Sequence, residues 1–276
     1  MRLASDKSAE RIDDMNAIAW DLLAEQHQCA GSYESLLQMK PIDVLGDWAL
    51  RWAESSGSKT VCHIACHLGL EAIAWAKAGY YCIGVDRSAI ALRGAKKYAS
   101  QVGIQQVEWC LADIGKELPI RSESIDLVWL SHGSIYWYPE IRPLLNRIVR
   151  LLRPGGVLLI EEIHPISLIV STLQCPKHPT LQRYSFDGKP IGKEVKMQYA
   201  GGSLPCPAHI WVHSLGDVVS GAVSSGLVII ELKELGWTKF KQFPFLMEHV
   251  RNQWSPINDS TFHPPLSFRL AMKRCE

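Results

Sequence analysis

The sequence predicts an α/β fold, in which a doubly wound, seven-stranded, mainly parallel sheet is preceded by N-terminal helices and interrupted by an inserted cap. Three observations predict it. From residue 60 onwards, short apolar runs of strand length alternate with stretches of helical periodicity. Residues 1–55 show helical spacing only, and residues 165–213 lose the alternation.

The N-terminal segment, residues 1–55, is predicted to be helical. Apolar residues recur there at helical spacing, as in Met15, Ala19 and Leu22. Gly31 and Pro41 punctuate the periodicity, so we expect several helices rather than one.

The first half of the sheet follows from alternating patterns. We expect strands in "TVCHIA" (60–65), "YYCIGVD" (80–86) and "QVEWCLAD" (106–113). The helix between the first two closes at Gly79, and the next is capped by Ser88.

The second half continues the pattern. "SIDLVWLS" (124–131) and "VLLIEEI" (157–163) are predicted strands, joined by a helix that ends in Pro-Gly-Gly. A later helix has Ser214 as its N-cap, with Asp217 three residues on. The last two strands are expected at 227–235 and 266–274.

The chain divides into a core and a cap. Residues 56–164 and 214–276 supply the alternating elements and therefore the core. Residues 165–213 are rich in Pro, Gly and Lys, with strand-like fragments around the turn Asp187-Gly188. We interpret them as a substrate cap.

Composition narrows the class of protein. With 276 residues, a net charge of +1 and 47% hydrophobic residues, the chain is typical of a globular domain with a large core. It has no basic run that would indicate nucleic acid or a membrane surface, and no signal peptide or membrane span. Its eight cysteines are irregularly spaced, which indicates reduced thiols and a cytoplasmic protein.

The stretch "CHIACHLG" (62–69) places Cys62, His63, Cys66 and His67 close together. A haem or zinc site is one interpretation. The spacing is one residue too long for the Cys-x-x-Cys-His haem pattern, and no second ligand cluster follows. Successive side chains of a strand also point to opposite faces, so the four residues could not converge. The context favours a ligand-binding loop after the first strand.

Acidic residues at two neighbouring strand ends support that interpretation. Asp86 ends the second predicted strand and Asp113 the third. In an open parallel sheet, ligands bind outside the carboxyl ends of the strands, where an acidic residue can hold ribose hydroxyls.

From residue 60 to 163 the chain resembles the class I S-adenosylmethionine-dependent methyltransferases, which have a Rossmann-like sheet. "VCHIACHLG" aligns with their first motif, Val-Leu-Asp-Leu-Gly-Cys-Gly-x-Gly. His63 stands at the usual Asp, Ala65 and His67 stand at glycines, and Gly69 is kept. The loop is similar to a small-molecule branch with the pattern His-x-x-Cys-His-x-Gly, in which Ala65 departs from the usual Gln. "GVDRS", "LADI" and the block from "DLVWLSHG" to "EEIHP" continue the resemblance.

The resemblance implies S-adenosylmethionine as the cofactor, with the N-terminal helices covering its site. Asp86 would hold the ribose and Asp113 would face the adenine. The full set of implied cofactor contacts is His63, Ala65, Cys66, His67, Gly69, Asp86, Arg87, Ser88, Asp113, Ile114 and Ser131.

The implied reaction is methyl transfer to an N, O or C atom of a small, apolar or aromatic metabolite, in natural-product biosynthesis. A hydroxyl acceptor needs a base, for which His132 and His164 are the candidates at strand ends. The candidate substrate contacts are Tyr136, Trp137, Trp211 and His213. A binding or accessory protein without turnover is the alternative, because the loop lacks two glycines. The sequence leaves the oligomeric state open, with a homo-oligomer among the alternatives.

Overall fold

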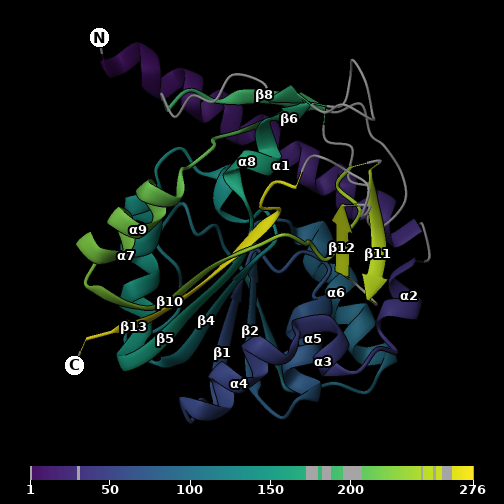
Figure 1. Ribbon diagram of the computed structural model, residues 1–276. Helices are drawn as coiled ribbons and strands as arrows, with labels where there is room; N and C mark the ends of the chain where they lie inside the picture. Colours follow the sequence, from purple (N-terminus) through teal and green to yellow (C-terminus); the bar gives the residue numbers. More distant parts are fainter. Residues whose placement is uncertain are drawn as a thin grey trace.

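A computed structural model describes residues 2–29, 32–171, 180–181, 188–194, 207–243, 245–250, 253–256 and 263–275 (Figure 1). Its centre is a seven-stranded sheet built from β1 (Thr60–Ile64), β2 (Tyr81–Asp86), β3 (Val107–Leu111), β4 (Ile125–Ser131), β5 (Leu152–Ile163), β10 (Leu227–Leu235) and β13 (Ser267–Arg274). The strand order is β10-β13-β5-β4-β1-β2-β3.

The sheet is doubly wound, as predicted. Strands β1 to β5 pair in parallel, and β13 lies antiparallel between β5 and β10. The chain order reverses between β1 and β4, so their carboxyl ends mark the point where an open sheet binds ligands.

Strand side chains explain why the sheet is covered on both faces. In β4, Val128 and Leu130 pack into one apolar layer, whereas Leu127 and Trp129 pack into the other. All four are essentially inaccessible to solvent. A strand buried on both faces reads as a continuous apolar run, which is why "IDLVWL" shows no polar alternation.

Helices form the two outer layers. Helices α7 (Ile141–Leu151) and α9 (Leu215–Ser224) cover one face, and α3 (Pro41–Leu45), α4 (Asp47–Ser55), α5 (Leu70–Lys77) and α6 (Ala89–Gln101) cover the other (Figure 1). The long N-terminal helix α1 (Arg2–Cys29), followed by the short α2 (Ser32–Leu36), packs against α6. None of the described helices is long and apolar enough to cross a bilayer.

The predicted caps are confirmed. The Ser88 hydroxyl accepts a hydrogen bond from the Ala91 amide at the start of α6. Ser214 and Asp217 form a reciprocal capping box at the start of α9.

Three parts differ from the predicted elements. Strand β5 begins at Leu152, because Leu152 already pairs with Ile125 of β4, before a shift in register that precedes the pairing of Val157 with Leu127. The hairpin of β11 (Leu246–Val250) and β12 (Gln253–Pro256) was not predicted, since these short strands form a separate sheet without a clear alternation. The insert holds α8 (Pro165–Ile169) and four short strands, β6 (Val170–Ser171), β7 (Thr180–Leu181), β8 (Ile191–Glu194) and β9 (Pro207–Ile210). Asp187 of the predicted turn lies outside the described residues.

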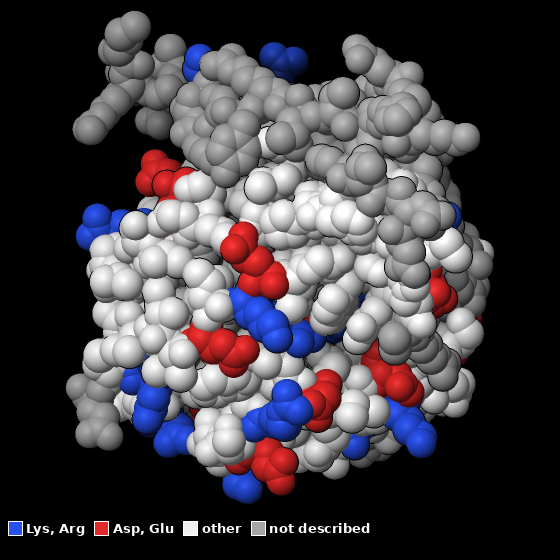
Figure 2. Space-filling view, viewed as in Figure 1, with Lys and Arg blue, Asp and Glu red and all other residues white. Residues whose placement is uncertain are grey.

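Charged side chains are mixed on the face shown in Figure 2. Acidic and basic residues alternate over the lower part of that face and do not gather into a field of one sign. This surface therefore gives no electrostatic footprint for a polyanion.

Candidate active site

A pocket opens at the carboxyl ends of β1, β2 and β4, beneath α1. It lies where the order of the parallel strands reverses. The residues lining it are Asn16, Trp20, Ile64, Ala65, His67, Val85, Asp86, Arg87, Ala112, Ile114, Ser131, His132, Gly133, Ser134, Trp137 and Tyr138. Of the predicted cofactor contacts, this set includes Ala65, His67, Asp86, Arg87, Ile114 and Ser131.

The loop after β1 keeps a glycine-like backbone without the glycines. Ala65 has a φ of 56° and His67 a φ of 49°. A left-handed conformation costs an L-residue about 1–2 kcal/mol. The strain is held in place by neighbouring bonds: the Cys66 amide donates to the Val85 carbonyl at 2.9 Å and the His67 amide to Asp86 Oδ2 at 2.7 Å. Backbone strain maintained in this way is common at ligand sites.

The His67 side chain turns toward α1. Its Nε2 lies 2.9 Å from Nδ1 of His27, and its ring meets Trp20 edge to face with centroids 5.4 Å apart. Burial, with His27 close by, lowers the pKa of His67 to about 3, and burial lowers that of His27 to about 4. Both rings are therefore neutral near pH 7, so one donates and the other accepts. His67, which stands at a glycine position of the motif, therefore binds α1 to the loop after β1.

Packing against Trp109, rather than contact with a ligand, explains why position 69 is a glycine. The φ of Gly69 is 76°, and a Cβ there would lie 2.4 Å from Cη2 of Trp109. Trp109 also covers Gly84 of β2, where a Cβ would lie 2.8 Å from the same ring. Gly69 does not line the pocket. The close approach of Trp109 explains why this motif position holds a glycine.

Asp86 combines a structural role with an open position. Its Oδ1 accepts from the Ser88 amide at 2.8 Å and its Oδ2 from the His67 amide. Burial raises the pKa of Asp86, while the amides of Ser88 and His67 oppose the rise. Each carboxylate oxygen can accept a second bond, so the group can still receive hydroxyls from a ligand.

Arg87 ties the pocket to α1. Its guanidinium makes a bidentate pair with Asp13, at 2.6 and 3.0 Å, and lies 3.6 Å from Oδ2 of Asp113. Asp113 also accepts from the Gly115 amide and from the Tyr138 hydroxyl. The Ser88 hydroxyl likewise donates to Asp21 of α1. Asp113 and Ser88 thus support the rim from behind the lining.

His63 lies buried under the pocket. Its Nε2 is 3.3 Å from Oε2 of Glu71 and 3.4 Å from the Ser131 hydroxyl. Burial lowers the pKa of His63 to about 4. Cys66, another predicted contact, is buried beside Gly84 of β2. Neither residue lines the pocket. His63 points to the opposite face of β1 from Ile64, which does line it.

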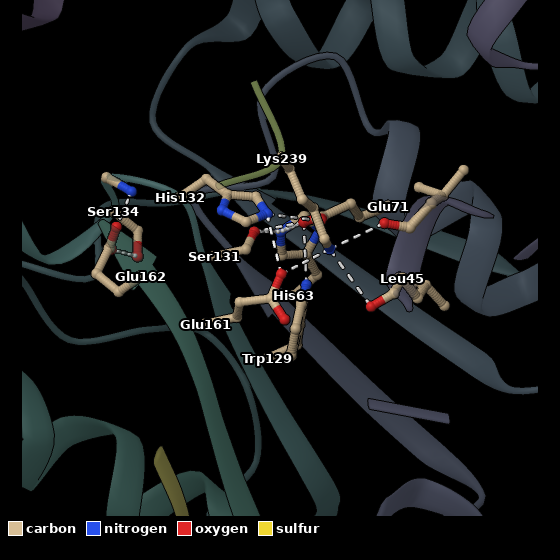
Figure 3. Close-up of polar contacts among 12 residues, drawn as sticks. Leu45, His63, Glu71, Trp129, Ser131, His132, Ser134, Glu161, Glu162 and Lys239 are labelled. Carbon is tan, nitrogen blue, oxygen red and sulfur yellow. Dashed lines mark hydrogen bonds and ion pairs between the residues drawn. The ribbon is translucent and has the colours of Figure 1, made fainter. Parts of the chain in front are cut away.

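His132 reaches the pocket on the first residue after β4, with a φ of 45°. Its Nε2 lies 3.5 Å from Glu161 and 3.9 Å from Glu71, and neither ring nitrogen has a hydrogen-bond partner (Figure 3). Burial lowers its pKa and Lys239 lowers it further, against the opposite effect of the two carboxylates. His132 is therefore a neutral imidazole facing the pocket.

Glu162 organises the loop that carries His132. Its carboxyl accepts from the Ser134 hydroxyl (Figure 3). It also accepts from the amides of Gly133 and Ile135. Burial raises the pKa of Glu162 to about 7, although these donors oppose the rise.

Four other residues that the sequence suggested as catalytic or substrate-contacting do not line the pocket. His164 is 3% exposed, with its Nε2 2.9 Å from Glu234 and its Nδ1 accepting from the Ile166 amide. Tyr136 stacks on His213, and the Trp211 amide donates to the Tyr136 carbonyl. All four are outside the pocket lining, whereas Trp137 is part of it.

The sequence analysis did not predict Asn16 and Trp20, which line the pocket from α1. It also missed Glu71 and Lys239, whose charged groups lie close to His132. Glu71 was marked by its position two residues after Gly69, in the first turn of α5. Lys239 carried no signal, because it follows β10 in a loop without periodicity.

Within the described residues, no group of three His, Cys, Asp or Glu side chains could hold a metal ion.

Comparisons with known proteins agree with this geometry. Residues 62–160 match the family model described as a methyltransferase domain. A trans-aconitate 2-methyltransferase of Azoarcus sp. is 38% identical over 79 residues, which are 29% of this chain and 28% of that protein. A malonyl-[acyl-carrier protein] O-methyltransferase of Hamiltonella defensa is 26% identical over 147 residues, 53% of this chain and 51% of the relative.

The chain therefore spans about a quarter to a half of the length of these curated relatives. A crystal structure of an S-adenosylmethionine-dependent methyltransferase from Mesorhizobium loti superposes with a TM-score of 0.56 at 17% identity, covering 82% of this chain and 96% of that one. The fold is that of this class of enzyme, and methyltransferase-domain sequence lies on the segment that builds the pocket.

Proposed function

We propose that this protein is an S-adenosylmethionine-dependent methyltransferase of a small, apolar or aromatic molecule. The observation that carries the proposal is the pocket at the ends of β1, β2 and β4, with Asp86 in its wall and a neutral His132 beside it. Residues 62–160, which match a methyltransferase domain, contribute most of the lining. The curated relatives act on trans-aconitate and on malonyl-acyl-carrier protein, as their names state.

The pocket fits the cofactor by the chemistry of its wall. The backbone at Ala65 approaches the cavity with a small side chain, and Asp86 offers carboxylate oxygens suited to ribose hydroxyls. Ile64, Val85 and Ile114 supply apolar surface. When bound, S-adenosylmethionine supplies an electrophilic methyl group, while the protein aligns the acceptor and excludes water.

His132 would act as the base for a hydroxyl acceptor. With Nε2 carrying its proton toward Glu161, Nδ1 would take the proton that the acceptor oxygen loses on methylation. The methyl carbon would exchange its bond to the cofactor sulfur, which leaves as a neutral thioether, for the bond to that oxygen. The resulting imidazolium would be stabilised by Glu161 and Glu71. An amine or an activated carbon would need less help, so the geometry favours transfer to oxygen.

The acceptor we favour is neutral. Among the described residues of the lining, the only Lys or Arg is Arg87, which Asp13 and Asp113 already neutralise. Trp20, Trp137 and Tyr138 offer aromatic surface instead. We accordingly infer a phenol-like or aliphatic alcohol, with specialised metabolism as the setting.

Calorimetry with S-adenosylmethionine, followed by a methyl-transfer assay on phenols, alcohols, amines and carboxylic acids, tests the proposal. We expect micromolar binding and transfer to a neutral hydroxyl. Binding without transfer to any acceptor would favour the accessory-protein alternative, and no binding at high micromolar cofactor would refute the proposal.

A further inference from the structure

A balanced cluster of charges lies beneath His132. Glu71 of α5, Glu161 of β5 and Lys239 from the loop after β10 converge there from distant parts of the sequence (Figure 3). Arg269 of β13 completes the cluster through its ion pair with Glu161. Two carboxylates meet two cations, so the cluster is neutral while its histidines are neutral. Charges buried to this degree require such pairing.

Lys239 is the residue that links the two carboxylates. Its Nζ lies 2.9 Å from Glu161 Oε1 and 3.8 Å from Glu71 Oε1. The ammonium also donates to the carbonyl of Val44 at 3.0 Å, with that of Leu45 at 3.4 Å, and lies 5.9 Å from the Trp129 ring centre. These contacts hold the ammonium in one place, between two backbone carbonyls and the two carboxylates.

The carboxylates are held in turn. Glu161 Oε2 accepts from Arg269 Nε at 2.6 Å, and Glu71 Oε2 accepts from Trp129 Nε1 at 3.0 Å and from the Ser131 hydroxyl. Although burial raises the pKa of Glu161, Lys239, His132 and Arg269 lower it to about 2. Against the effect of burial, Lys239, His63 and His132 also lower the pKa of Glu71. Both carboxylates are therefore anionic, and each presents its Oε1 atom to His132 Nε2.

We propose that Lys239 is a positioning residue for His132: its ammonium holds Glu161 and Glu71 beside Nε2 and balances their charge, leaving Nδ1 ready to accept a proton. The inference rests on the proposed function. The charged and titratable groups that face His132 are Glu71, Glu161, Lys239, Arg269 and His63, and the Phe240 ring closes a further side. Without Lys239 this set gains one net negative charge, which favours the protonated imidazole.

The test compares Lys239→Met with Lys239→Arg, and with Lys241→Met as the matched control. Lys241 is exposed, two residues further along the same loop, and its ammonium lies over Trp254. The readouts are NMR titration of the His132 ring and the pH dependence of methyl transfer. In Lys239→Met we expect the midpoint of the His132 titration to rise by about one pH unit, a tenfold change in its protonation equilibrium.

Turnover of Lys239→Met should therefore fall on the acid side of the pH profile and recover at higher pH. Lys239→Arg, which keeps the charge, should restore the midpoint toward the parent value, and Lys241→Met should match the parent. Glu161→Gln combined with Lys239→Met removes one charge of each sign and should return the midpoint toward the parent value, which keeps the test valid if Lys239→Met folds poorly. An unmoved His132 midpoint, or a loss of turnover equal at every pH, overturns the role of Lys239. The NMR titration needs no turnover, so failure of the proposed function would be seen separately, as absent cofactor binding in the parent.

Discussion

Nδ1 of His27 lies 2.9 Å from Nε2 of His67, and this hydrogen bond joins α1 to the loop after β1. Among the described residues, the Asp13–Arg87 ion pair and the Asp21–Ser88 hydrogen bond also join α1 to the segment after β2. All three meet residues that lie next to Asp86 or bond to it. The helix over the pocket is therefore attached to the same segment that would hold the ribose.

Acid should loosen this attachment. Since burial lowers the folded-state pKa of both rings below 6.5, the stability they contribute is complete above pH 6.5 and declines as the pH falls toward 4. Between pH 6.5 and 5 the loss is up to about 2 kcal/mol per ring. Urea denaturation at the two pH values should show a smaller loss in His27→Gln than in the parent. His249→Gln, at an exposed position of β11, is the control, and equal losses in all three proteins would contradict the prediction.

Asp86→Ala should weaken S-adenosylmethionine binding ten- to a hundredfold, or about 1.5–3 kcal/mol, because a charge-assisted acceptor is lost. Asp113→Ala should lose less, since Asp113 stands behind the lining. Calorimetry measures both, at a temperature where thermal melts show folded protein, because Asp86 also accepts the His67 and Ser88 amides. Glu108→Ala, on the exposed part of β3, should bind like the parent. Full affinity in Asp86→Ala would reduce Asp86 to its structural role.

Gly69→Ala should destabilise the fold by about 2–4 kcal/mol, from the left-handed backbone and from overlap with Trp109. Gly103→Ala is the matched control: its φ is 70° but nothing lies within 4 Å of the added Cβ, so only the backbone cost of about 1–2 kcal/mol applies. Urea denaturation gives both values. In a Trp109→Leu background the extra cost of Gly69→Ala should shrink, and an unchanged cost would mean that Trp109 is not the cause.

His132→Ala should lower methyl transfer to a hydroxyl acceptor by about 10²–10⁴-fold while cofactor binding persists. In the parent, activity should rise with pH through a value below 6.5, because burial and Lys239 favour the neutral ring. His164→Ala should keep most of the turnover, since its ring bonds to Glu234 away from the pocket. The comparison is made at saturating cofactor and acceptor. Equal, near-parental turnover in both variants would show that no histidine base is needed.

The sequence by itself determined the sheet and the position of the site. Apolar runs such as "IDLVWL", bounded by turn signals, are typical of strands buried on both faces, and parallel strands bring their carboxyl ends to one edge. Asp86, Ala65, Ser131 and His132 were predicted in this way, because each follows or ends such a strand, and all four line the pocket. The helix caps at Ser88 and Ser214 could also be predicted from the sequence, since each cap depends on neighbours within three residues.

Tertiary structure decided which of these side chains face the pocket and what holds them. Nothing in the pattern assigns His67 to His27, Gly69 to Trp109 or His132 to Lys239, because each partner lies 40 or more residues away in an element whose docking depends on packing. The same limit applies to His164 and His213, which have the right chemistry and follow strands, yet lie outside the pocket lining, where they contact Glu234 and the Tyr138 carbonyl. Local periodicity specifies elements and their ends, whereas side-chain contacts between elements form only when the layers pack together.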